Sequence, residues 1–302
     1  MRLKVEIKNY LSKQKTRVEK ALKRYIPAAA APFSEHIEAM RYSLFAGGKR
    51  IRPVLCLAAG EAICSDPETT ENLLPVACAL ECIHTYSLIH DDLPAMDDDE
   101  LRRGKPTNHM IYGEAGAILA GDGLLTMAFE LITDTTTSSL TAQQRLQIAN
   151  TVARASGSFG MVGGQALDIA NENTEYPFEM LQTIHRNKTG ALITASLHCG
   201  AIGCNADTSQ TEALLEYGKH IGLAFQIVDD LLNVTATTEQ LGKKAGSDEV
   251  LGKATYPAFF GIEETRNKAR QAVAYAQEAI AHFDDRAEPL RLLAAYVFER
   301  SH

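Results

Sequence analysis

The sequence of 302 residues has no tryptophan and no Cys-X-X-Cys pair, although it contains six cysteines. Zinc at Cys78 and Cys82, which share a helical face, is therefore a weaker interpretation than buried, reduced thiols in a cytoplasmic protein. The longest stretch without Asp, Glu, Lys or Arg is residues 189–206, which includes glycines, a histidine and several hydroxyl side chains. This stretch predicts a buried helix and no membrane span. The N-terminus also lacks the apolar region of a secretory signal.

The sequence also has no excess of basic residues: it contains 38 acidic and 30 basic side chains, for a net charge of −8. This balance argues against nucleic acid as the main partner. The charge is uneven: the first 24 residues hold nine basic and two acidic side chains, so the rest of the chain carries about −15. We expect residues 1–30 to form a solvated basic helix rather than a targeting or membrane segment. The acidity of the remainder requires an explanation.

Apolar residues recur at helical spacing along most of the chain, and strand patterns are nearly absent. Turn-forming clusters separate these segments, and none is long enough to act as a linker between domains. We therefore predict an all-α fold, a single large bundle formed by residues 1–302. The helices are expected at residues 34–46, 49–63, 72–92, 114–132, 142–169, 178–204, 211–234, 254–282 and 287–300.

The densest polar signal is the run His90–Glu100, in which six carboxylates occur within ten residues. Carboxylates this close raise one another's pKa unless a cation lies between them. Asp91 and Asp97 would not share a face of a regular helix, but Pro94 interrupts the helix and can return Asp97 to the side of Asp91. The alternative is a solvated acidic helix end. Against it, the run directly follows an apolar stretch.

A second polar ridge lies on an otherwise apolar helix, with side chains at i, i+3, i+4 and i+7: Gln226, Asp229, Asp230 and Asn233. A carboxylate pair on a buried helix must be matched by cations. Two aspartate pairs on two buried helices indicate hard divalent ions. Mg²⁺ is the first candidate, because it prefers carboxylates combined with phosphate oxygens and water.

Basic groups complement these carboxylates. The segment Gly47–Pro53 opens a helix, and Leu101–Lys105 follows the first acidic run. The first segment is not a Walker P-loop, because Ser43 stands where the first glycine should be and Arg50 replaces the Ser or Thr. Further lysines lie in or beside helix ends: Lys188, Lys243 and Lys253. The combination predicts a site for two phosphorylated substrates, one held through metal ions and one by Lys, Arg and His side chains.

Taken together, these motifs resemble those of the trans-prenyltransferases, the polyprenyl diphosphate synthases. The acidic run resembles the first aspartate-rich motif of that family, DDxxxxD, and Phe225–Asp230 resembles the second. The segments GGKRxRP, LRRGxPT, GQxxD (Gly164–Asp168), KT and GKxTxP follow in the family's order between about residues 40 and 260. The two-residue-longer first motif is similar to the bacterial and plastid branch, and bacterial-type farnesyl diphosphate synthases are the closest match.

The resemblance implies an isoprenoid-synthase bundle around a central cavity, usually a homodimer, with Mg²⁺ as cofactor. Three ions per site are implied, and Mn²⁺ is a possible substitute. Asp91 and Asp97, with Asp229 opposite, would hold the ions that bridge an allylic diphosphate. The full set of predicted metal ligands is Asp91, Asp92, Asp97, Asp229 and Asp230.

The resemblance also implies roles for the other polar residues. Isopentenyl diphosphate would be bound without metal by Lys49, Arg52, His84 and Arg103. The allylic diphosphate would be bound by Arg102, Lys188, Thr189, Gln226, Lys243 and Lys253. The residues implied in catalysis, at the developing carbocation, are Lys188, Thr189 and Gln226.

The implied reaction is a Mg²⁺-dependent, head-to-tail condensation of isopentenyl diphosphate with dimethylallyl or geranyl diphosphate. It yields farnesyl diphosphate (C15) and pyrophosphate. Tyr86 lies five residues before Asp91, about 7.5 Å further along the helix axis, and is the predicted floor of the cavity. In the family a bulky residue there accompanies C15 products, whereas smaller residues permit C20. Because the adjacent Ser87 is small, a geranylgeranyl diphosphate synthase remains the alternative.

Two other protein classes share parts of this pattern. A terpene cyclase has aspartate-rich motifs but needs no isopentenyl site. A non-catalytic regulatory subunit should have lost its carboxylates. One position departs from the family: Asn233 stands where the second motif usually ends in Asp, which keeps an oxygen acceptor but loses a charge. We expect activity to survive this change, with a higher requirement for Mg²⁺.

Overall fold

Helices dominate the computed structural model, which describes residues 2–172, 174–235 and 254–299. The predicted all-α fold is confirmed, and in these ranges the strands amount to one two-stranded hairpin. In chain order the elements are α1 (Arg2–Tyr25), α2 (Ser34–Leu44), α3 (Ile51–Ile63), α4 (Pro67–Glu71), α5 (Leu74–Asp91), β1 (Leu101–Arg102), β2 (Lys105–Pro106), α6 (Asn108–Thr133), α7 (Ala142–Ser156), α8 (Met161–Ala170), α9 (Phe178–His185), the π-helix η1 (Arg186–Gly190), α10 (Ala191–Gly203), α11 (Thr208–Thr235), α14 (Tyr256–Ala279), the 3₁₀-helix η2 (Asp285–Ala287) and α15 (Glu288–Glu299).

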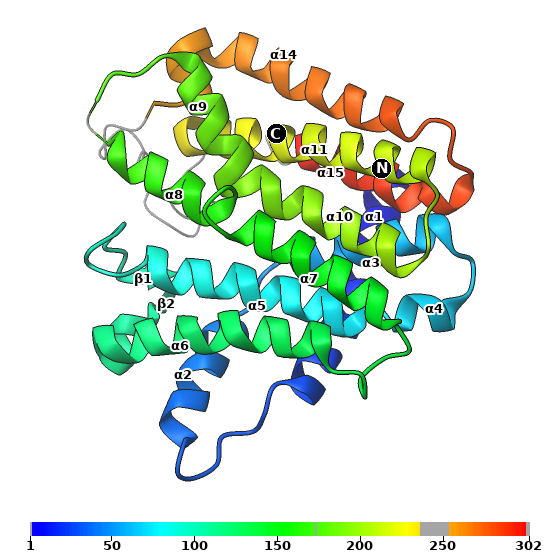
Figure 1. Cartoon of the computed structure of the whole chain (residues 1–302). Helices are drawn as coiled ribbons and strands as arrows, with labels where there is room; N and C mark the ends of the chain where they lie inside the picture. The colour runs from blue at the N-terminus through cyan, green and yellow to red at the C-terminus, as the bar shows by residue number, and fades with distance from the viewer. Residues whose placement is uncertain (1, 173, 236–253, 300–302) are drawn as a thin grey trace.

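Two hydrophobic clusters hold the helices together. The first centres on α5 and α6 and includes Leu80 and Leu124, which are fully buried. The second centres on α11, α14 and α15 and includes Tyr217 and Leu290. The Tyr217 hydroxyl donates to the Leu290 carbonyl oxygen at 2.7 Å, so this buried polar group is satisfied. Figure 1 shows α5 and α6 side by side, with α10, α11 and α14 stacked beyond them.

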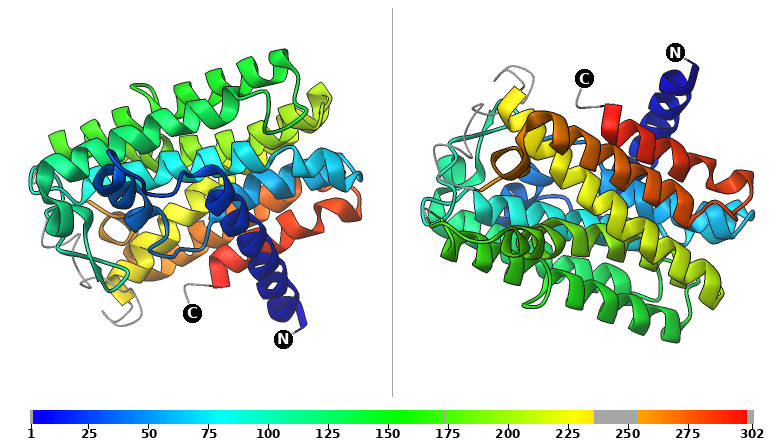
Figure 2. Two further views of the ribbon diagram at one scale, coloured as in Figure 1. Left: turned by 90° about the horizontal axis from the view of Figure 1, so that it is seen from below. Right: turned by 90° about the horizontal axis from the view of Figure 1, so that it is seen from above.

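The first helix, predicted as a solvated basic helix over residues 1–30, ends at Tyr25 and has one face packed on the bundle. Ile7, Val18 and Leu22 are buried against the bundle, while Lys8 and Lys13 are exposed. Figure 2 shows the N-terminal end of α1 projecting beyond the other helices. The basic charge of this segment is therefore carried into solvent, away from the core.

Among the described residues, two helical stretches are long and apolar enough to cross a membrane, judged by length and composition alone: Pro67–Asp91 and Asn108–Thr133. The bundle buries 72% of the most apolar 18-residue window in the first stretch and 39% of that in the second. The first is thus a core helix of the fold, as expected for α5, which is apolar on all sides. Two such helices are weak evidence for a span, and the second leaves part of its apolar surface exposed.

The structure differs from the predicted helix over residues 142–169, which is broken between Ser156 and Met161. Gly160 adopts φ −137° and ψ −129°, outside the helical region. A β-carbon at Gly160 would lie 2.1 Å from the carbonyl oxygen of Ala155. The sequence-based prediction of one helix was wrong here, because the apolar periodicity continues across Gly157 and Gly160. The break separates α7 from α8 and lets α8 take its own direction.

Candidate active site

A cavity of about 990 Å³ lies between α3, α5, α8, η1 and α11. It brings together most of the residues that the sequence predicted for the site. The predicted residues that line it are Lys49, Arg52, His84, Tyr86, Ser87, Asp91, Arg102, Arg103, Lys188, Thr189 and Asp229. Four others lie outside the lining: Asp92, Asp97, Gln226 and Asp230. Lys243 and Lys253 are outside the described residues.

The segment that follows α5 folds back onto the last turn of that helix. The helix stops at Asp91, Pro94 lies in the turn that follows, and the Asp97 backbone N–H donates to the Asp91 carbonyl oxygen at 2.9 Å. The backbone of Asp97 is therefore brought back to Asp91 in the turn that contains Pro94, although the Asp97 side chain lies outside the cavity lining. Burial, with a further contribution from the Asp97 charge, raises the pKa of the Asp91 carboxyl to about 6. A nearby cation would favour the ionised carboxylate.

Asp92 has a different environment from Asp91. Arg102 donates from Nε to both of its carboxylate oxygens, at 2.8 and 2.9 Å. Asp92 is buried, and Arg102 belongs to the hairpin strand β1. The pair therefore ties the hairpin to the end of α5, and the Arg102 side chain still reaches the cavity wall.

On α11 the two aspartates also divide. Asp229 lines the cavity, whereas Asp230 is buried behind it. Asp230 accepts from Gln226 Nε2 at 3.1 Å and from the Tyr256 backbone N–H at 2.9 Å, which joins α11 to α14. Asn233, the departure from the family pattern, is buried and outside the cavity lining as well.

The π-helix η1 lies between α9 and α10 in the chain, and its residues Lys188 and Thr189 line the cavity. Gly164 of α8 makes this possible, because a β-carbon there would lie 2.2 Å from the Lys188 backbone nitrogen. Asp168, one turn further on α8, accepts from Lys188 Nζ at 2.6 Å. Thr189 Oγ1 donates to Gln226 Oε1 at 3.0 Å. The GQxxD segment thus positions the Lys–Thr segment, and π-turns of this kind are frequent at functional sites.

A basic corner, formed by Lys49, Arg52, His84 and Arg103, occupies the wall at the start of α3. Removal from water lowers the pKa of Arg52 to about 10. Burial and then the nearby arginines lower the pKa of His84 well below its ordinary value. Each of these shifts records a cost of holding positive charge here, and an anion would relieve it. The corner is therefore suited to bind a diphosphate directly.

A buried ion pair supports this corner from behind. Arg50 donates to Glu81 Oε1 and to the Leu44 carbonyl oxygen, both at 2.7 Å. Arg50 takes the left-handed conformation, φ 54°, at the start of α3, and both charged side chains are almost fully buried. The pair fixes the loop that carries Lys49 between α2 and α5.

The sequence analysis did not predict several polar residues of the cavity wall, among them Glu81, His90 and Gln165. Glu81 lines the cavity, and an acid in the middle of the apolar α5 was a signal for a buried partner. Gln165 also lines the cavity, and neither its amide oxygen nor its amide nitrogen has a hydrogen-bond partner although both are buried. A bound molecule would satisfy those atoms.

The carboxylates fit a divalent cation shared with a ligand. Within the described residues, no three His, Cys, Asp or Glu side chains converge on one point. Instead Asp91 and Asp229 approach the cavity from different helices. Mg²⁺ is commonly bound by one or two carboxylates together with substrate phosphate oxygens and water, so this donor set suits it.

The fold and the site together define an all-α transferase of the isoprenoid-synthase class. A family model described as Polyprenyl synthetase matches residues 34–288. The chain belongs to the polyprenyl synthetase family and is an enzyme of prenyl transfer.

Similar proteins cover the chain almost from end to end. Farnesyl diphosphate synthase of Geobacillus stearothermophilus is 46% identical over 298 residues, 99% of each chain. Geranylgeranyl diphosphate synthase of Cyanophora paradoxa is 47% identical over 97% of this chain and 96% of its own. The crystal structure of an FPP/GFPP synthase from Zymomonas mobilis, without ligand, superimposes with a TM-score of 0.85. It is 37% identical and covers 97% of this chain and 99% of its own. These names differ in product length.

The buried pair behind the basic corner leads to a stability prediction. Arg50→Met leaves Glu81 buried without its partner and should lower the free energy of unfolding by about 3–5 kcal/mol. The double variant Arg50→Met/Glu81→Leu should recover most of this loss, because no buried charge remains. Chemical denaturation measures both. Lys219→Met, which removes an exposed ion pair with Glu216, is the control and should change little. Equal effects of Arg50→Met and Lys219→Met would contradict the prediction.

Proposed function

We propose that the protein is a Mg²⁺-dependent farnesyl diphosphate synthase. It condenses isopentenyl diphosphate with dimethylallyl or geranyl diphosphate, head to tail, and releases pyrophosphate. One observation carries the proposal: the carboxylates of Asp91 and Asp229 line the same cavity as the metal-free basic corner around Arg52 and His84. Two differently charged parts of one wall suit two diphosphates, one bound through metal and one bound directly.

In this proposal each diphosphate has its own side of the cavity. Asp91, Asp97 and Asp229 would hold Mg²⁺ for the allylic diphosphate, and Arg102 and Lys188 would contact its oxygens. The metal, when bound, would supply positive charge for the leaving diphosphate. The basic corner holds isopentenyl diphosphate with its double bond directed at the allylic C1.

The middle of the cavity suits a carbocation. Thr189 lines the cavity, and its Oγ1 is held by a hydrogen bond to Gln226 Oε1, which lies outside the lining. An oxygen dipole fixed in this way stabilises positive charge without attacking it. Met161, Ile193 and Phe225 provide apolar wall beside Thr189. An apolar wall excludes water, which would otherwise capture the allyl cation.

Tyr86 supports the C15 product over C20. Its side chain is buried and lines the cavity on the α5 wall, below Asp91. A growing chain that extends from the carboxylates along α5 meets this ring. Relatives of almost equal identity are named for C15 and for C20 products, so the cavity floor rather than overall similarity supports this choice.

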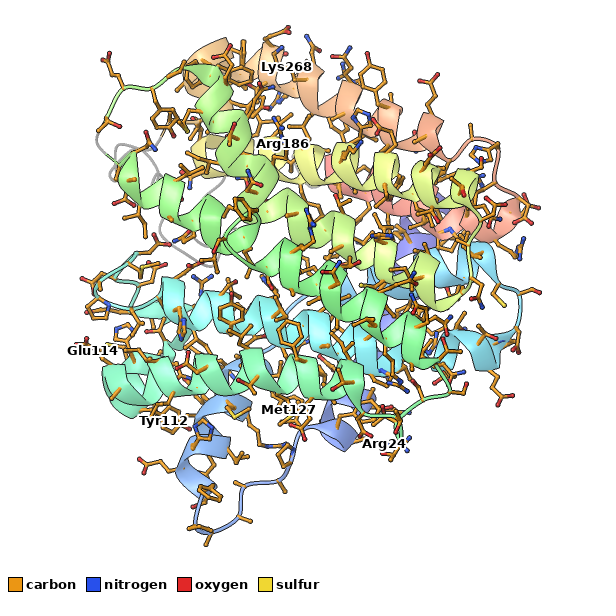
Figure 3. The ribbon with its side chains drawn as sticks, in the orientation of Figure 1. Arg24, Tyr112, Glu114, Met127, Arg186 and Lys268 are labelled. Carbon is orange, nitrogen blue, oxygen red and sulfur yellow. The ribbon has the colours of Figure 1, made fainter. Side chains whose placement is uncertain are left out.

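We also propose a cytoplasmic homodimer in which residues 1–302 form one domain. The six cysteines are free thiols, which suits a reducing compartment. Apolar side chains on α6 are 43–58% exposed: Met110, Ile111, Ile118 and Leu119. Tyr112 of α6, which is labelled in Figure 3, meets Tyr42 of α2 edge-on, with ring centroids 5.8 Å apart.

The exposed apolar side chains of α6 are the proposed dimer contact, and they lead to a prediction. Light scattering should measure twice the mass of one chain, and Leu119→Glu should shift the protein toward the monomer, because it places a charge in the apolar contact. Glu114→Gln on the same helix is the control. A wild-type protein with the mass of one chain would contradict the dimer.

The proposed reaction is tested with the pure protein, isopentenyl diphosphate, geranyl diphosphate and Mg²⁺. Farnesyl diphosphate should form, and removal of metal by a chelator should abolish it. Asp91→Asn should reduce turnover by roughly 100-fold, because a carboxylate that binds metal loses its charge. Asp98→Asn, an exposed carboxylate of the same run, should retain turnover. No product with any allylic diphosphate would favour a regulatory subunit, whereas a cyclic product made without isopentenyl diphosphate would favour a terpene cyclase.

Product length is tested by Tyr86→Ala. Removal of the ring deepens the cavity, so products longer than C15 should appear with excess isopentenyl diphosphate. Ser87→Ala, which changes a small neighbour in the same wall, should leave the C15 product in place. An unchanged product from Tyr86→Ala would show that Tyr86 does not limit the chain.

A further inference from the structure

His90 lies beside the proposed cavity floor, and no role above uses it. It is one turn after Tyr86 on α5, and the two rings meet edge-on, with centroids 5.7 Å apart and planes at 76°. His90 also lines the cavity. Its Nε2 lies 3.0 Å from the Ile118 carbonyl oxygen of α6, to which it donates in the tautomer that carries a proton on Nε2. The His90 ring thus connects the Tyr86 ring to the backbone of the neighbouring helix.

The surface of α6 is shaped around this ring. Gly121, one turn after Ile118, faces His90 so closely that an added β-carbon would lie 2.1 Å from Nε2. The adjacent Ala117 and Ala120 are fully buried in the same contact between α5 and α6 (Figure 1). A glycine at position 121 therefore provides the space in which the His90 ring lies.

We propose that His90 is a positioning residue for product length. The His90 ring, held by the Ile118 carbonyl oxygen and accommodated by Gly121, limits rotation of Tyr86 and keeps its ring across the end of the cavity. A tyrosine side chain turns about two torsions, so a ring without this contact leaves the floor position more often. The proposal rests on the proposed synthase function, because it concerns how far that reaction elongates its product.

The test uses the ratio of C20 to C15 product made from geranyl diphosphate and excess isopentenyl diphosphate. The ratio is compared at equal conversion of geranyl diphosphate, so that it does not depend on how much active enzyme a variant retains. His90→Ala should raise the ratio roughly tenfold, which corresponds to one lost contact of ordinary strength. His90→Phe, which keeps a ring but not the hydrogen bond, should give a smaller increase.

Gly121→Ala tests the same unit from the other helix, without a change on α5. The new β-carbon displaces the His90 ring from Ile118, so the ratio should rise. Gly123→Ala is the matched control, because its β-carbon would instead approach His36 Nε2 and Met40 Sδ, both at 2.9 Å. That variant should keep the wild-type ratio.

A double variant separates positioning from general loosening of the helices. If His90 acts through Tyr86, Tyr86→Ala/His90→Ala should give the same ratio as Tyr86→Ala alone, since the held ring is already absent. The proposal is overturned if Gly121→Ala and His90→Ala keep the wild-type ratio while Tyr86→Ala changes it, and the synthase function then stands. An equal rise in Gly123→Ala, or full additivity in the double variant, also overturns it. Absence of any prenyl product from the wild-type protein would overturn the synthase function itself.

Discussion

The site depends on one constraint: groups that carry like charges lie close together and are buried in one cavity. Burial and Asp97 oppose ionisation of Asp91 on one wall, and burial lowers the pKa values of Arg52 and His84 on another. The charged forms of these side chains are therefore destabilised on both walls until a partner of opposite charge is bound. A ligand that carries both metal ions and phosphate relieves both walls at once. Part of the acidity of the chain beyond its first helix thus lies at this cavity, in Asp91 and Asp229.

Ion pairs between described residues around the cavity moderate this repulsion, among them Arg50–Glu81, Arg102–Asp92 and Lys188–Asp168. Each joins residues from different segments, so each also fixes geometry: the loop before α3, the hairpin and the π-helix, respectively. The two hydrophobic clusters supply the packing free energy that holds these segments in place. The site is therefore formed by the fold before any ligand is bound.

The proposed charge chemistry and the proposed limit on chain length lie in different parts of the cavity. The ionic groups gather where α5, α8, η1 and α11 approach one another. The proposed floor lies at the contact between α5 and α6, where Tyr86 meets His90 and His90 meets Gly121. Relatives named for C15 and for C20 products are 46% and 47% identical to this chain, so overall identity does not separate the two products.

The sequence alone determined the all-α class, most helix boundaries and the two aspartate-rich segments, because apolar periodicity and Pro94 act locally. Only the tertiary structure decided which polar side chains share a cavity. Gln226, Asp229 and Asp230 lie on one polar ridge of α11, and the sequence does not distinguish them. In the structure Gln226 donates a hydrogen bond to Asp230, and Asp229 is the one that lines the cavity. The break before α8, the Glu81 partner of Arg50 and the contact of His90 with α6 were likewise not predictable. Helical spacing reports which face of one helix is polar, whereas these contacts depend on how helices distant in the chain pack together.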